Sequence, residues 1–129
     1  MRSMTPVQST WNEILGYSRA VRVGSTIAVS QTAATGPDGE ALHPGDPAQQ
    51  ARVILQRIEV ALKSLGASMS DVVETRVYVT NIDKWEEVGR VHGQVFGTIR
   101  PAMTMIEVNR LMDPAITVEI SAMAVIDHS

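Results

Sequence analysis

The fold is decided by the last third of the sequence, which reads RPAMTMIEV (residues 100–108) and then TVEISAMAV (residues 117–125). Both segments are rich in the apolar and β-branched residues that favour strands, and a turn at Asp113-Pro114 separates them. Glu119 lies in the middle of the second segment, which otherwise predicts a buried strand. An ionised carboxylate inside a sheet is costly unless something pairs with it or uses it. Glu119 is therefore the first candidate for a functional residue.

Two helices are predicted upstream of these strands. Asp46-Pro47 supplies an N-cap and a first helical residue, and Gly66 follows the end of that helix. Its apolar stripe consists of Val53, Ile54, Ile58, Ala61, Leu62 and Leu65. Asp83 and Glu86 have the spacing of a capping box that opens a second helix, which ends near Gly97. The stripe of the second helix is Trp85, Val88, Val91, Val95 and Phe96.

Three further strands complete the expected order β-β-α-β-α-β-β. Two of them, 21–23 and 27–33, are joined by a hairpin turn at Gly24-Ser25. The third, 72–80, alternates with a period of two residues and places Val73, Thr75, Val77 and Val79 on one side. This order predicts one α+β domain over residues 1–129, with two helices on one face of a mixed sheet.

The sheet face away from the helices predicts self-association. The final strand directs Ile116, Val118, Ile120, Ala122 and Ala124 to one side, which suits burial under the helices. The opposite side mixes polar and apolar residues, among them Glu119 and Met123. A half-apolar sheet face without helices of its own is best covered by other copies of the chain. We therefore expect a homo-oligomer.

Composition narrows the classes of function. The formal net charge is −3 and the pI about 5.5, so neither nucleic acid nor an anionic membrane is an expected partner. The chain has no cysteine, and its histidines (His43, His92 and His128) lack metal-ligand spacing, so we expect no metal and no cofactor. Residues 1–13 lack the apolar core of a signal peptide, which favours a cytoplasmic protein.

An ordered set of segments resembles the RidA/YjgF family over most of the chain. The segments are Gly16-Tyr17-Ser18-Arg19-Ala20, Val29-Ser30-Gln31, Gly45-Asp46, residues 100–108, and Val118-Glu119-Ile120-Ser121-Ala122. The resemblance implies an α+β chorismate-mutase-like fold with a six-stranded mixed sheet, two helices on one face, and a trimeric barrel. Ligand sites in this family lie in clefts between subunits.

The resemblance also implies a reaction and a set of site residues. The best-known activity of the family is hydrolysis of reactive imines and enamines, such as 2-aminoacrylate. By resemblance, Glu119 is the catalytic residue that positions or activates the attacking water. The residues expected to bind the ligand are Tyr17, Ser30, Met103, Thr104 and Met105.

The main departure from the family is Met103, where deaminase members carry an arginine that binds the substrate carboxylate. A thioether cannot replace a guanidinium as a hydrogen-bond donor, so 2-aminoacrylate is not the expected substrate. Three arginines are open as substitutes, namely Arg19, Arg76 and Arg100. A role for His92 is also left open.

Three functions follow from these observations. The first is hydrolysis of a small compound with a C=N bond. The second is a trimer that binds a small metabolite without turnover. The third is an endoribonuclease, which the acidic chain and its low aromatic content disfavour.

Overall fold

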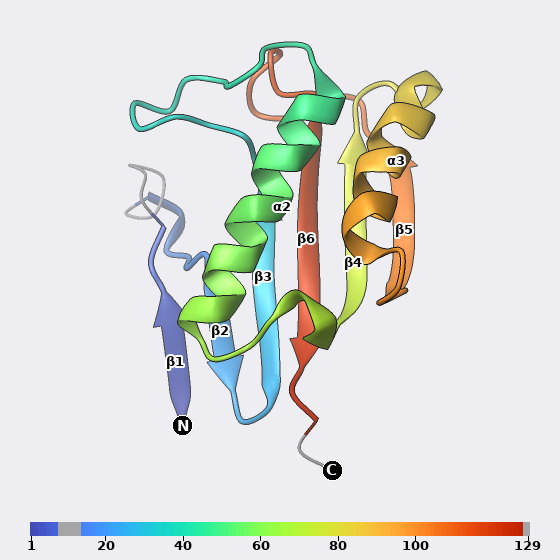
Figure 1. Ribbon diagram of the computed structural model, residues 1–129. Helices are drawn as coiled ribbons and strands as arrows, with labels where there is room; N and C mark the ends of the chain where they lie inside the picture. The colour runs from blue at the N-terminus through green and yellow to red at the C-terminus, as the bar shows by residue number, and fades with distance from the viewer. Residues whose placement is uncertain (8–13, 128–129) are drawn as a thin grey trace.

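A six-stranded sheet with helices on one face forms the protein (Figure 1), in a computed structural model that describes residues 1–7 and 14–127. This confirms the predicted mixed sheet with two helices on a single face. The strands are β1 (Arg2–Thr5), β2 (Ala20–Val23), β3 (Thr26–Thr32), β4 (Val72–Val79), β5 (Ala102–Glu107) and β6 (Val118–Val125). The helices are α2 (Pro47–Ser64) and α3 (Trp85–Phe96), with short 3-10 helices η1 (Met69–Asp71) and η2 (Ile82–Lys84).

The strand order β1-β2-β3-β6-β4-β5 places β6 in the interior of the sheet. The β4–β5 pair is parallel and the other pairs are antiparallel. In Figure 1, α2 lies in front of β3 and β6, while α3 lies in front of β4 and β5. The residues of β6 predicted to face the helices are all buried, since Val118, Ile120 and Ala124 have no exposed surface and Ala122 has little.

Helix α2 begins and ends as predicted. The Asp46 side chain accepts a hydrogen bond from the backbone N–H of Gln49, Pro47 occupies the first turn, and Gly66 has a positive φ of 86°. Its core-facing residues Ile54, Ile58 and Leu62 are fully buried. These features depend on neighbours within one helical turn, which explains why the sequence pattern predicts them well.

The predicted alternation of β4 is wrong at its start. Val73 was expected on the same side as Thr75 and Val77, which are buried, yet it is 45% exposed and Val72 is buried instead. The register against β6 shifts between Val72 and Glu74, which inserts one extra residue and reverses the facing of this end. From Thr75 onward the predicted facing is correct.

The predicted start of the second helix is also wrong. Asn81, rather than Asp83, provides the cap, because its side chain accepts a hydrogen bond from the Asp83 N–H and begins η2. Helix α3 then starts at Trp85 without a side-chain cap. Trp85 and Val95, predicted in the apolar stripe, are exposed, whereas His92 is buried beside Val88, Val91 and Phe96.

The face of the sheet opposite the helices, here called the open face, carries exposed apolar side chains. Strand β1, which the sequence pattern did not predict, extends this face at one edge. The register places five exposed apolar side chains on it: Met4, Val23, Ile106, Met123 and Val125. None of the described helices is long and apolar enough to cross a membrane.

Candidate functional site

Glu119 lies on the open face, half-buried between β3 and β4. Its neighbours Val118 and Ile120 point into the core, so strand alternation directs Glu119 outward. The side-chain amide of Gln31 donates a 2.6 Å hydrogen bond to Oε1 of Glu119. Tyr78 is its cross-strand neighbour on β4. The carboxylate is therefore held by one amide in a sheet interior, with no salt bridge to any described residue.

Burial raises the pKa of Glu119 above the ordinary value for glutamate. The hydrogen bond from Gln31 and the positive charge of Arg19 act in the opposite direction but are weaker. A carboxyl group with a raised pKa is better able to accept and return a proton near neutral pH. Such groups concentrate at functional sites.

Arg19 brings the other predicted residues of this region together. Its Nη1 atom donates hydrogen bonds to the hydroxyl oxygens of Ser30, at 2.7 Å, and Thr32, at 3.1 Å. The Arg19 guanidinium carbon lies 5.9 Å from the ring centroid of Tyr17, within the range of a cation–π interaction. The register shift between Val29 and Thr32 alters the regular alternation of side chains at this end of β3.

We call Tyr17, Arg19, Ser30, Gln31 and Glu119 the Glu119 cluster. The structure thus brings together three of the predicted site residues, Tyr17, Ser30 and Glu119. Gln31 is an additional member whose contact with Glu119 joins residues 88 positions apart in the chain. In the sequence it was part of the Val29-Ser30-Gln31 segment but was not predicted as a site residue.

Arg57 is a second residue that sequence reasoning missed. It projects from α2 and donates hydrogen bonds to the backbone carbonyls of Ala33, at 3.0 Å, and Thr35, which follow β3. Burial and the positive charge of Arg19 both lower the pKa of Arg57. The charge of Arg57 therefore interacts with that of Arg19, although Arg57 extends from a helix on the other face of the sheet.

Met103 and Met105 lie on the face of the sheet opposite to Glu119. In the parallel β4–β5 pair they are aligned with Thr75 and Val77, which are buried under the helices. Met105 packs against the core, while Met103 at the sheet edge is 40% exposed. Thr104 shares the open face with Glu119 but lies two strands away, on β5. Within one chain, the two methionines and Glu119 do not meet.

The other candidate arginines have different partners. Arg76 forms a 3.1 Å salt bridge with Glu74, which raises the pKa of Arg76. Arg100 donates a hydrogen bond to the carbonyl oxygen of Gly97, just after α3. Of the three arginines left open by the sequence, only Arg19 belongs to the Glu119 cluster.

His92 is part of a buried pair on the helix side of the sheet. Its Nε2 atom lies 2.8 Å from the hydroxyl oxygen of Thr75, and its ring centroid is 4.6 Å from that of Phe96. Burial lowers the pKa of His92, so the neutral ring is favoured. Thr75 is aligned with Met103 in the register, so this pair lies on the same face as the methionines.

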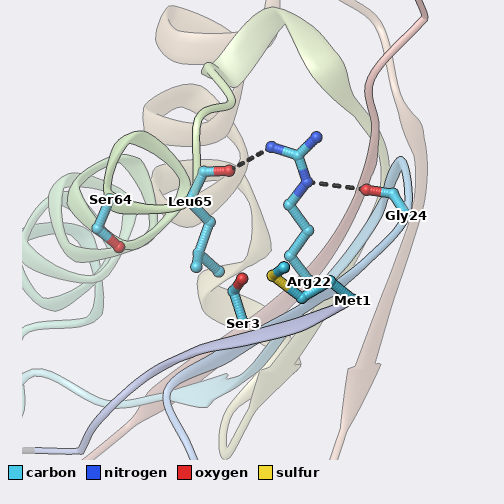
Figure 2. Close-up of a pocket in the computed structure, with 6 residues that line it drawn as sticks. All are labelled: Met1, Ser3, Arg22, Gly24, Ser64 and Leu65. Atoms are coloured by element: carbon cyan, nitrogen blue, oxygen red, sulfur yellow. Dashed lines mark hydrogen bonds between the residues drawn. The ribbon is translucent and has the colours of Figure 1, made fainter.

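Two further features lie apart from the Glu119 cluster. A surface hollow beside Arg22 is lined by Met1, Ser3, Gly24, Ser64 and Leu65, at the C-terminal end of α2 (Figure 2). Within residues 1–7 and 14–127, no three histidine or acidic side chains are grouped as metal ligands would be. His128 lies outside the described residues, as do residues 8–13 of the N-terminal segment.

Comparison with known proteins gives consistent matches. Residues 8–126 match the family described as Endoribonuclease L-PSP. A member of the YjgF/YER057c/UK114 family from Mycobacterium tuberculosis is 45% identical, with a TM-score of 0.89 over 98% of this chain and 100% of that one. A RutC family protein from Pyrococcus abyssi is 32% identical over 74% of this chain and 75% of its own length. E. coli TdcF, solved with bound serine, is 27% identical with a TM-score of 0.77, over 86% and 88% of the two chains.

Proposed function

Because the chain belongs to the Endoribonuclease L-PSP family, to which the RidA/YjgF, RutC and UK114 proteins belong, we propose that it hydrolyses a small imine or enamine. The chorismate-mutase-like fold of this family is the one described above. The reaction takes place in a cleft between subunits of a homotrimer, and Glu119 is the catalytic residue.

The observation that carries this proposal is the state of Glu119. Its carboxyl group is half-buried, has a raised pKa, and is held by Gln31 rather than by a cation. In the proposed step it accepts a proton from water while the water oxygen bonds to the carbon of the C=N group. The π electrons of the protonated C=N group move to nitrogen, which gives a carbinolamine. Glu119 passes its proton to that nitrogen, the C–N bond breaks to release ammonia, and the hydroxyl group returns a proton to the carboxylate, which leaves a carbonyl compound. Water is the only co-reactant.

The positions of the site residues support a cleft between subunits. Met103 and Met105 lie on the helix side of β5, whereas the Glu119 cluster lies on the open face. One chain therefore cannot close a pocket from both groups. The exposed apolar side chains of the open face also favour contact with another copy. A site completed by two copies accounts for both features.

The substrate is expected to differ from 2-aminoacrylate. Met103 provides no cation at the position where deaminase members bind the substrate carboxylate. The bound serine in TdcF supports a ligand of about the size of an amino acid, since that protein has the same fold. A neutral imine, or one whose charge is bound elsewhere, fits these constraints.

The test is hydrolysis of a panel of imines that amino acid and amine oxidases generate in the cuvette, with carbonyl product and ammonia measured. We expect accelerated hydrolysis of at least one imine, and a loss of roughly 100-fold or more in Glu119→Gln. Glu119→Gln keeps the size of the side chain and can still accept the hydrogen bond from Gln31. Glu59→Gln, which removes an exposed carboxylate on α2, is the matched control and should keep full activity.

Two other outcomes identify the alternatives. Saturable binding of small metabolites without accelerated hydrolysis of any imine would indicate a binding trimer. RNA cleavage that survives repeated purification and disappears in Glu119→Gln would indicate an endoribonuclease. The net charge of −3 gives little attraction for a polyanion, which favours the hydrolase.

A further inference from the structure

Arg19 is a positive charge beside Glu119 that the described residues leave without a salt bridge. Arg57, on α2, is a second arginine without a salt bridge to the described residues, and its charge interacts with that of Arg19. The salt bridges of the described part of the chain are Lys63–Glu59, Arg76–Glu74, Lys84–Glu87 and Arg90–Glu86. Every other partner recorded for the two arginines is an uncharged hydroxyl, carbonyl or ring.

Glu119 does not compensate the charge of Arg19. Glu119 feels the charge of Arg19, yet its pKa is raised overall, because burial outweighs that attraction. A carboxylate in direct ion contact with Arg19 would have a lowered pKa. Arg19 therefore remains available to an anion from outside.

Arg19 is held in a fixed orientation. Among the described residues, its hydrogen bonds to Ser30, Thr32 and the Gln31 carbonyl all come from Nη1. The Tyr17 ring supports the guanidinium at 5.9 Å. These hydrogen bonds use only the Nη1 group of the guanidinium, which carries five N–H donors in all. A guanidinium that is already oriented loses little freedom on binding, which favours affinity.

We propose that Arg19 is an anion subsite that binds a carboxylate group of the ligand beside Glu119. The anion-binding property stands on the contacts that orient Arg19, while its place in the reaction rests on the proposed function. The ligand is then a small organic acid, held from the same side of the cleft as Glu119 rather than from Met103. Arg19 is thus a specificity-determining residue.

The experiment measures binding of pyruvate and of its neutral analogue pyruvamide by calorimetry, at low and at moderate salt. We expect the wild-type protein to bind pyruvate about tenfold more tightly than pyruvamide, with a preference that salt weakens. Arg19→Gln should lose roughly tenfold in pyruvate affinity and leave pyruvamide unchanged. Arg19→Lys, which keeps the charge but not the planar fork, should lose less for pyruvate. Arg52→Gln removes the same charge from an exposed site on α2 and should match the wild type.

Several results would overturn the subsite. The first is the absence of saturable pyruvate binding to the wild type, and the second is equal wild-type affinity for pyruvate and pyruvamide. The third is that Arg19→Gln and Arg19→Lys each lose as much affinity for pyruvamide as for pyruvate. The last result would assign Arg19 a structural role. None of these measurements needs turnover. If pyruvate binding depends on Arg19 but no imine is hydrolysed, the anion subsite stands and the hydrolase proposal fails.

Discussion

Glu119 carries an energetic cost that its proposed role explains. A carboxyl whose pKa is raised in the folded state binds its proton more tightly there than in the unfolded chain. The stability that this provides is present at low pH and is lost as the pH rises through the raised pKa. At neutral pH the ionised, half-buried group therefore weakens the fold, as expected for a residue retained for chemistry.

Replacing Glu119 by Gln should stabilise the protein at pH 8. The substitution removes the cost of burying the ionised form and retains an acceptor for Gln31. The gain should shrink as the pH falls towards 4, because wild-type Glu119 is then protonated. Urea unfolding of both proteins at several pH values, at one fixed protein concentration, measures the difference. A destabilised variant at pH 8 would show that the charge of Glu119 supports the fold.

His92 gives the opposite dependence on pH. Burial lowers the pKa of this ring, so the unfolded chain binds a proton more readily than the folded one. The contribution of neutral His92 is present above the ordinary histidine pKa of about 6.5 and is lost as the pH falls below it. We expect the wild type to lose stability between pH 7.5 and 5.5, and His92→Gln, which can still bond Thr75, to lose less.

The control for this prediction is His43→Gln, which removes an exposed histidine from a loop. It should show the same loss between the two pH values as the wild type, in urea unfolding at equal protein concentration. If His92→Gln is as sensitive to acid as His43→Gln, protonation of His92 does not limit stability in this range.

At the scale of elements, the sequence predicted the features that depend on neighbouring residues, but not those that depend on long-range contacts. Helix α2 was predicted from Asp46 to Gly66 because its caps and stripe act within a few residues. The facing of Val73 depends on a register shift against β6, and β1 on pairing with β2, and neither has a local signature. The start of α3 was missed because Asn81 forms a competing local turn.

The candidate site shows the same division. The sequence and its family resemblance predict Tyr17, Ser30 and Glu119 as site residues, and the structure brings these three together. The contact of Gln31 with Glu119 joins β3 to β6, and that of Arg57 joins α2 to the chain after β3. Such contacts depend on how the elements pack, which composition and spacing do not specify.

Arg22 connects the hairpin between β2 and β3 to the end of α2 through two hydrogen bonds (Figure 2). Its Nε donates to the carbonyl oxygen of Gly24 at 2.8 Å and its Nη1 to that of Leu65 at 2.7 Å. Arg22→Met keeps much of the volume but removes both bonds, so we expect a loss of about 1–2 kcal/mol in stability. Urea unfolding measures it, with Arg52→Met as the exposed control that should cost far less. An equal loss of stability in the two variants would show that the hydrogen bonds of Arg22 do not stabilise the fold.

At the scale of the whole molecule, one face of the sheet forms the core and the other carries the candidate site. The helix side supplies the core and holds the His92–Thr75 pair beside Met103. The open face presents the Glu119 cluster together with exposed apolar residues. If the site forms between copies, assembly and activity depend on the same face, so a variant that separates the subunits should also lose the reaction.

Met123→Glu tests this link directly. Met123 is 41% exposed on the open face, opposite Ala28 of β3, and a charge there should prevent an apolar contact between copies. Light scattering on a size-exclusion column should give about three times the 14.0 kDa chain for the wild type, and a smaller mass for this variant. Val60→Glu, a matched change at an exposed valine of α2, should keep the wild-type mass and activity. Because the Glu119 cluster is complete within one chain, Met123→Glu should still bind pyruvate through Arg19, yet hydrolyse imines no faster than buffer. A wild-type protein that runs as a monomer, or a monomeric variant that keeps full activity, would refute a site shared between subunits.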